Sequence, residues 1–165
     1  MLFHKQKNTI PHPWSEVTLA VWKKYPNPFA SHVLSADVID RYVDAQGVLH
    51  TTRLFLKKGK IPSWGAALIK IPEAFILEKS SVNPKTKEMV IHQHNLSHTK
   101  LLLIKETTRI TEIESITKLK NSVTVISNTG FTPIRERLEK FGLSRFKQNT
   151  LNSFKGLLHV LENRH

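Results

Sequence analysis

The sequence of 165 residues contains no cysteine. This absence excludes disulfide bonds, thiol nucleophiles and cysteine-ligated zinc or iron–sulfur centres. Long apolar runs are also missing, since no uninterrupted stretch approaches the roughly 18 residues that a membrane-spanning helix needs. Residues 1–13 lack the continuous apolar core of a secretory signal, and no arginine precedes Arg41. We therefore expect neither a cleaved secretory signal nor an Arg-rich transit peptide in this sequence.

Acidic residues are scarce relative to basic ones, with 13 Asp and Glu against 25 Lys and Arg. The formal net charge is +12 and the sequence pI is about 10.1. Such an excess predicts a polyanionic partner, either nucleic acid or anionic lipid, and composition alone does not choose between them. Hydrophobic residues make up 39% of the chain and the mean hydropathy is −0.28, which is typical of a folded globular protein. We predict one domain over residues 1–165.

Motifs for catalysis are absent from the sequence. There is no phosphate-cradling glycine-rich loop, no Gly-x-Ser-x-Gly elbow and no zinc-protease helix motif. His92 and His94 share a strand face and His98 follows in a turn, but no carboxylate or cysteine at matching spacing completes a metal site. We therefore predict no catalytic residue, no metal site and no enzymatic activity.

The hydrophobic pattern predicts an α+β fold with a strand-rich middle between two helices. An apolar stripe at helical spacing begins at Trp14, ends with Tyr25 and is stopped by Pro26. A short helix is expected at residues 62–70, and a final helix of roughly 45 Å is expected at residues 133–162. Strands with short, turn-rich connections are expected at residues 1–10, 33–43, 48–57, 74–82, 88–96, 100–113 and 118–127. These elements predict a curved antiparallel sheet of about seven strands wrapped around a long C-terminal helix.

Three separated segments carry a family resemblance. The first is Lys24-Tyr-Pro-Asn-Pro-Phe-Ala-Ser-His32-Val-Leu-Ser, and the second is Thr51-Thr-Arg-Leu-Phe-Leu-Lys-Lys-Gly-Lys60-Ile-Pro-Ser-Trp64. The third is Phe141-Gly-Leu-Ser-Arg-Phe-Lys-Gln-Asn149. Together they resemble the PRELI-like family of mitochondrial phospholipid transfer proteins, over residues 2–161. The third segment is similar to the corresponding helix segment in the branch of the family that carries phosphatidic acid. The resemblance implies that sheet and helix enclose a lipid cavity.

The resemblance also implies a binding site. Lipid-headgroup binding is expected from Lys24, His32, Arg53, Lys58, Lys60, Arg145 and Asn149. A lid that contacts the membrane is expected from Pro62, Trp64, Leu68 and Ile69, an apolar segment flanked by lysines. Because the loop is one residue shorter than the family pattern, Lys57 is the alternative to Lys58. The residues alone leave plainer roles open: a rigid corner for the first segment, and solvent-exposed faces for Arg53 and Arg145.

The function implied is transport rather than chemistry. A member of this branch would shuttle phosphatidic acid across the mitochondrial intermembrane space in support of cardiolipin synthesis, with the phospholipid as cargo and no cofactor. Its partners would be anionic mitochondrial membranes and a small helical twin-Cys-x9-Cys protein, with which it forms a heterodimer. A sister branch that carries phosphatidylserine is the alternative. A basic nucleic-acid-binding domain is a more remote one, since no such motif is present and the aromatic residues fall on faces expected to be buried.

Overall fold

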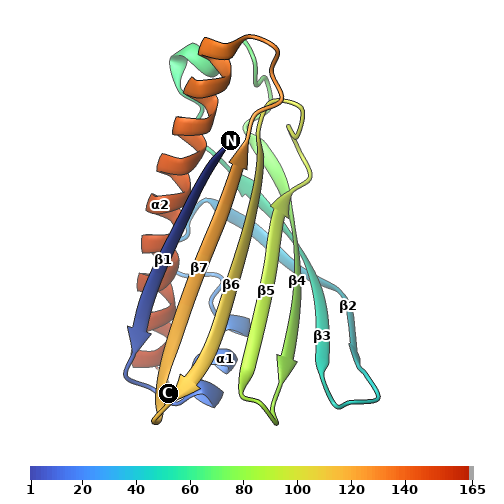
Figure 1. Cartoon of the computed structure of the whole chain (residues 1–165), viewed down its shortest axis with the longest axis vertical. Coiled ribbons are helices and arrows are strands. Elements are labelled where there is room, and N and C mark those ends of the chain that lie inside the picture. Colours follow the sequence, from blue (N-terminus) through green and yellow to red (C-terminus); the bar gives the residue numbers. More distant parts are fainter. Residues whose placement is uncertain (164–165) are drawn as a thin grey trace.

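Seven antiparallel strands form one continuous curved sheet in the computed structural model, which describes residues 1–163 (Figure 1). The strand order is β1-β7-β6-β5-β4-β3-β2, so the first strand of the chain pairs with the last and the other strands follow as a meander. The strands are β1 (Leu2–Ile10), β2 (Val33–Val43), β3 (Leu49–Lys58), β4 (Glu73–Asn83), β5 (Glu88–Asn95), β6 (Leu103–Ile113) and β7 (Ile116–Ile126). β1 and β2 are the two edges.

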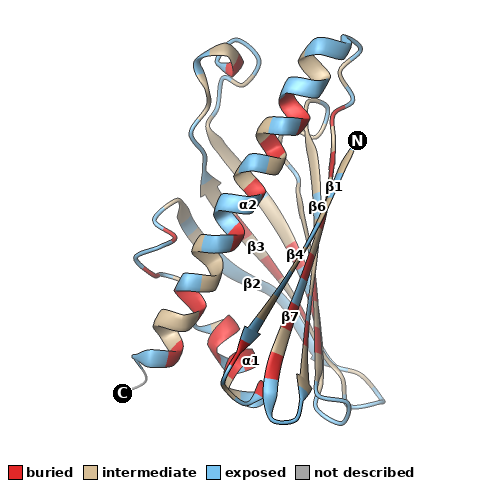
Figure 2. Ribbon diagram, turned by 60° about the vertical axis from the view of Figure 1, so that its left-hand side comes forward, coloured by how far each residue is buried: buried red, intermediate tan, exposed pale blue. Residues whose placement is uncertain are grey.

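Two helices lie on the inner face of this sheet. The long helix α2 (Thr132–Glu162) crosses the face beside β1 and β7, and α1 (Trp14–Trp22) packs near one end of it (Figure 2). Pro133 lies in the first turn of α2, where its missing N–H leaves no hydrogen bond unmade. The two helices and the sheet thus enclose the interior of the protein between them.

The apolar core is concentrated where α1, β5 to β7 and the C-terminal end of α2 meet. Val17, Met89, Ile110 and Leu157 are among its buried members. A smaller cluster further along the sheet joins Val123 and Val125 to Phe146. In β7 buried residues alternate with more exposed ones, as expected of a strand with one face against the core. The cavity described below borders the first cluster, since Val21, Ile91 and Leu157 of that cluster line it.

The predicted fold class is confirmed, with differences at two elements. α1 ends at Trp22 rather than Tyr25, because a residue before proline is disfavoured in helical conformation and Pro26 follows Tyr25. The predicted helix over residues 62–70 is reduced to one 3₁₀ turn, η1 (Ser63–Gly65). Gly65 and the flanking Pro62 and Pro72 leave too short a run for a stable α-helix. No helix within residues 1–163 combines the length and apolar character needed to cross a bilayer.

Gly156 of α2 lies directly against Asn27, in the corner between α1 and β2. A Cβ atom at position 156 would come within 2.7–2.9 Å of three Asn27 side-chain atoms. Asn27 is fixed there, because its Nδ2 donates to the Lys24 carbonyl (2.6 Å) and its Oδ1 accepts from the Phe29 N–H (2.9 Å). The glycine therefore allows α2 to sit tightly on the corner that carries residues 24–32.

We expect Gly156→Ala to lower the free energy of unfolding by about 1–2 kcal/mol, because the added methyl group overpacks this contact. The sign is the opposite of the gain of about 1 kcal/mol that alanine normally brings inside a helix. Urea denaturation of the purified protein measures the difference. Gly130→Ala is the matched control, since nothing lies within 4 Å of a Cβ there. A Gly156→Ala protein as stable as wild type would contradict this prediction, because Asn27 would then have shifted to accept the methyl group without cost.

Candidate functional site

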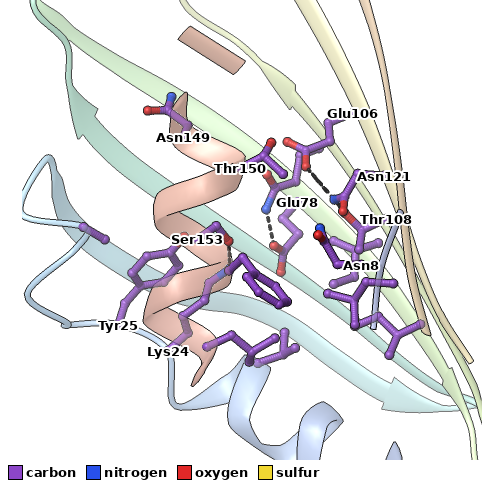
Figure 3. A pocket seen from close by; sticks show the side chains of 18 of the residues that line it. Asn8, Lys24, Tyr25, Glu78, Glu106, Thr108, Asn121, Asn149, Thr150 and Ser153 are labelled. Atoms are coloured by element: carbon purple, nitrogen blue, oxygen red, sulfur yellow. Dashed lines mark hydrogen bonds between the residues drawn. The ribbon is translucent and has the colours of Figure 1, made fainter. Parts of the chain in front are cut away.

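A cavity of about 80 Å³ lies between the inner face of the sheet and the two helices (Figure 3). Its wall combines apolar side chains such as Val21, Ile91 and Phe154 with a larger set of polar and charged ones. The polar lining residues are Asn8, Lys24, Tyr25, His32, Lys57, Glu78, Gln93, Glu106, Thr108, Asn121, Asn149, Thr150 and Ser153. Binding pockets for drug-sized ligands commonly measure about 300–1,000 Å³ and are mostly apolar. This cavity is thus small and unusually polar.

One side of the cavity is cationic. Lys24 lies in the corner after α1 and Lys57 near the end of β3, and both line the wall. The Lys24 Nζ donates to the Ser153 hydroxyl of α2 (2.8 Å) and lies 5.0 Å from the centre of the Tyr25 ring. Burial alone would raise the pKa of Tyr25, but Lys24 and Lys57 beside it hold that pKa below its ordinary value. The site is therefore prepared to stabilise negative charge.

His32 also lines the cavity and shares Lys57 with Tyr25 as a charged neighbour. Burial, Lys57 and Arg145, in that order, lower the pKa of its imidazole. Its backbone carbonyl accepts a hydrogen bond from the Lys58 N–H (2.8 Å), which fixes the start of β2 against the end of β3. His32 is thus favoured in its neutral form, beside the positive charges of Lys57 and Arg145.

The opposite side of the cavity consists of a row of polar residues that crosses the sheet. Strand register places Arg53 opposite Glu78, Glu78 opposite Gln93 and Gln93 opposite Glu106. Glu106 accepts from the Asn121 amide (3.2 Å), and burial raises the pKa of its carboxyl against the opposing effects of Lys57 and Lys24. Within the described residues of the chain, the Asn8 Nδ2 is the buried side-chain atom that has no hydrogen-bond partner.

Arg53 and Glu78 form a buried ion pair in this row. Their side chains are 5% and 2% exposed, and the Glu78 Oε1 accepts a hydrogen bond from Arg53 Nε (2.7 Å) and lies 2.6 Å from Arg53 Nη2. Gln93 donates its amide to the other Glu78 oxygen. Glu78 and Gln93 line the cavity, whereas Arg53 lies outside the lining set. The Glu78 side chain is therefore the part of this ion pair that lines the cavity.

The lid segment (residues 59–72) connects β3 to β4 and packs against α2. The Trp64 ring meets the Phe141 ring edge-on, with centroids 5.9 Å apart, and the Arg137 guanidinium lies 4.8 Å from the Trp64 ring centre. Arg145 of α2 donates to the Lys60 carbonyl (3.0 Å). These contacts join the lid segment to the helix that forms one wall of the cavity.

The structure brings together only some of the residues of the predicted headgroup site. Lys24, His32 and Asn149 line the cavity, and of the two candidate lysines Lys57 lines it while Lys58 does not. Arg145 and Lys60 contact each other at the lid, and Arg53 is held by Glu78. Of the predicted lid residues, Trp64 packs on α2, Pro62 and Ile69 are half-buried, and Leu68 is exposed. Their roles in headgroup binding and membrane contact stay predictions.

Sequence reasoning missed the inner polar row. Glu78, Gln93 and Glu106 each interrupt a strand with a polar residue, a pattern that by itself also fits a solvent-facing position. Only the register across three strands, β4 to β6, shows that all three share the inner face. Tyr25, which the helical stripe predicts to be a core residue, instead lines the cavity.

Comparisons with known proteins match nearly the whole chain. The PRELI-like family profile matches residues 15–165. Protein UPS1, mitochondrial, from Saccharomyces cerevisiae is 34% identical over 164 residues, covering 98% of this chain and 94% of the relative. The ups1 homolog of Schizosaccharomyces pombe is 34% identical over 160 residues, covering 94% and 92%. Human PRELI domain-containing protein 1, mitochondrial, is 30% identical over 164 residues, covering 90% and 69%.

Solved structures share the fold at low sequence identity. The Zhui aromatase/cyclase of a Streptomyces species has a TM-score of 0.68 at 9% identity, covering 99% of this chain and 94% of that one. A START superfamily protein from Mycobacterium smegmatis has a TM-score of 0.54 at 12% identity, covering 97% of each chain. At these identities the likeness concerns architecture: a curved sheet closed by a long helix.

The raised pKa of Glu106 predicts a pH-dependent effect of Glu106→Gln. A carboxyl whose pKa is higher in the folded protein adds stability below its unfolded pKa of about 4.5, and that contribution is lost as the pH rises through the folded pKa. The Gln variant should therefore be more stable than wild type at pH 8, and the difference should shrink towards pH 4.5. Urea denaturation at both pH values measures it. Glu136→Gln, on the exposed side of α2, is the control. Equal stability at pH 8 would contradict the assignment.

The lid contacts predict that Trp64→Ala loosens the lid segment. Loss of the Phe141 and Arg137 contacts should raise the population of the open segment, so amide hydrogens of residues 61–70 should exchange about tenfold faster. Hydrogen–deuterium exchange with mass spectrometry measures this directly. Leu68→Ala serves as the control, because Leu68 is 37% exposed. Unchanged exchange in Trp64→Ala would mean that other contacts hold the lid.

Proposed function

This chain belongs to the PRELI-like family, and we propose that it is an intermembrane phospholipid transfer protein that carries phosphatidic acid between mitochondrial membranes, in support of cardiolipin synthesis. The observation that carries the proposal is the cavity lined by Lys24, Lys57 and His32. The lowered pKa of His32 favours its neutral imidazole, so the two lysines supply the positive charge. A phosphate monoester has about 1.5–2 negative charges near pH 7, and charge-assisted hydrogen bonds to lysine are strong. Transport requires no catalytic step, since the cargo is bound and released unchanged.

The size of the cavity supports a cycle of opening and closing. At about 80 Å³ it does not hold a phospholipid with two acyl chains. Cargo entry therefore requires the lid segment or α2 to move outward, which would also expose the apolar wall to the acyl chains. Trp64 and Lys60, which lie in the lid segment, would meet the membrane surface first, as tryptophan and lysine do at bilayer interfaces.

The net charge of +12 would bring the protein to anionic bilayers. Each basic residue near such a surface contributes about 1 kcal/mol of attraction. Because salt screens this attraction over a Debye length of about 8 Å at physiological ionic strength, transfer should slow as salt is added. The Saccharomyces cerevisiae and human relatives are named mitochondrial, which supports that organelle for this chain. By the same family resemblance we propose the intermembrane space and a heterodimer with a small helical twin-Cys-x9-Cys protein.

Phosphatidylserine is a second candidate cargo, favoured by the carboxylates on the inner polar row. Glu78 and Glu106 line the same cavity as Lys24 and Lys57. A headgroup that carries an ammonium beyond its phosphate would meet both signs of charge there, whereas phosphatidic acid has no ammonium for the carboxylates to bind. Direct competition between the two lipids separates the candidates.

The test is transfer of fluorescent phosphatidic acid between liposomes, run beside phosphatidylserine and phosphatidylcholine with protein co-expressed with the small partner. Lys57→Gln should reduce phosphatidic acid transfer about tenfold, because one charged hydrogen bond of roughly 1.5 kcal/mol is lost. Lys58→Gln is the matched control, since the neighbouring lysine is exposed and lies outside the cavity lining.

Each outcome decides between the candidate functions. Selective phosphatidic acid transfer that depends on Lys57 and not on Lys58 would support the proposal. Preferential transfer of phosphatidylserine would instead identify the second candidate as the cargo. Folded protein that transfers no lipid would contradict transport as the function.

A further inference from the structure

The buried charge of Arg53 already has a counter-ion in the closed protein. Its Nε donates to one Glu78 oxygen, its Nη2 lies against that same oxygen, and Gln93 donates to the other oxygen. Arg53, Glu78 and Gln93 are adjacent in the strand register of β3, β4 and β5. In the empty protein Glu78 therefore serves as the counter-ion of this guanidinium.

The guanidinium is also fixed in place. Its centre lies 4.9 Å from the ring centre of Trp22 and 4.9 Å from that of Phe55. Two aromatic faces and a 5% exposed side chain leave Arg53 little freedom to swing towards a ligand. Glu78 differs, because its carboxylate lines the cavity and borders the space that a ligand would fill.

The chemistry makes Glu78 and a phosphate competitors. A buried guanidinium without a counter-ion is strongly destabilising, so the empty protein needs an internal anion at this place. A phosphate monoester carries more charge than a carboxylate and has three acceptor oxygens. Lys24 and Lys57, which line the same cavity, would draw the same phosphate into it. The phosphate and the Glu78 carboxylate would then compete for the single guanidinium of Arg53.

We propose that the Glu78 carboxylate is an internal counter-ion that holds Arg53 while the cavity is empty and yields it to the phosphate group of the cargo. This rests on the proposed function, and it assigns Glu78 as the residue that sets how tightly the phosphate is retained. A carrier must release what it binds. Glu78 offers Arg53 a replacement partner at the moment of release, so the departing phosphate leaves no unpaired buried charge.

The decisive variant is Glu78→Gln, which keeps the shape of the side chain and frees the guanidinium. We expect it to bind dihexanoyl phosphatidic acid, a soluble short-chain probe, at least tenfold more tightly than wild type. Inorganic phosphate should likewise raise the melting temperature of this variant more than that of wild type. Without ligand the variant should be less stable than wild type, since Arg53 then lacks its counter-ion.

Glu106→Gln is the matched control, because it removes a carboxylate from the same cavity without releasing an arginine. The double variant Arg53→Gln with Glu78→Gln should lose the gain in affinity, which ties the effect to the pair rather than to net charge. If Glu78→Gln does not fold, Glu78→Asp decides instead. Its shorter carboxylate reaches the guanidinium less well, and it should tighten binding about threefold.

Folded Glu78→Gln that binds phosphate and phosphatidic acid no more tightly than wild type would overturn the proposal. So would an equal gain in Glu106→Gln. Wild-type protein that transfers lipid while the Glu78 variants bind as wild type would remove only this inference. Tighter binding by Glu78→Gln, in a protein whose wild type moves no lipid between vesicles, would instead remove the transfer function and leave the counter-ion in place.

Discussion

A charge withdrawn from water needs a partner, and this requirement organises the interior of the protein. Where α2 spans the sheet, the inner face does not close into a continuous apolar core. It carries Arg53 paired with Glu78, and Glu106 bonded to Asn121. Lys24 of the corner is held by Ser153 of α2. These bonds satisfy polar groups that would otherwise be costly to bury, so a polar cavity is tolerated beside the main apolar cluster.

The long helix is the element on which this arrangement depends. α2 contributes Arg145 to the lid contact and Asn149 and Ser153 to the cavity wall, and its Gly156 rests on the corner at Asn27. Gly142 permits a similar close approach at the smaller apolar cluster, since a Cβ there would lie 2.9 Å from Leu102 and Val125 side-chain atoms. The two close contacts seat the helix against the sheet side at Gly142 and against the corner at Gly156. The lysine-lined wall therefore keeps its position relative to the polar row.

Much of this fold could be predicted from the sequence, because alternating strands, short turns and proline-bounded helices are local signals. The predicted limits of the seven strands and α2 lie within a few residues of the observed ones. The lid differs, since the weak helical preference of residues 62–70 gives way to Gly65 and two prolines. The Arg53–Glu78 ion pair also could not be predicted from the sequence. It requires the register between strands that are joined by the lid segment, and nothing local to either residue specifies that register.

The family resemblance located Lys24, His32 and Asn149 at one cavity, although they lie far apart in the chain. It also singled out Arg53, whose charge is balanced from within the protein. A motif preserves the type of a residue and its spacing, but it does not state which neighbour neutralises a charge. That information resides in the partner strands, and for Arg53 it came only with Glu78 in place.

The pairing of the first strand with the last has a consequence for how the chain comes together. In the antiparallel ladder of β1 and β7, Ile10 pairs with Thr117 and Leu2 pairs with Val125. Strands β2 to β6, in contrast, each pair with the strand that follows in the sequence. This one pairing raises the contact order of the fold, and distant pairings slow folding. As synthesis proceeds from the N-terminus, β1 emerges first and has no partner until β7 has been made. The strand that the ribosome makes first is therefore the one whose place in the sheet is completed last.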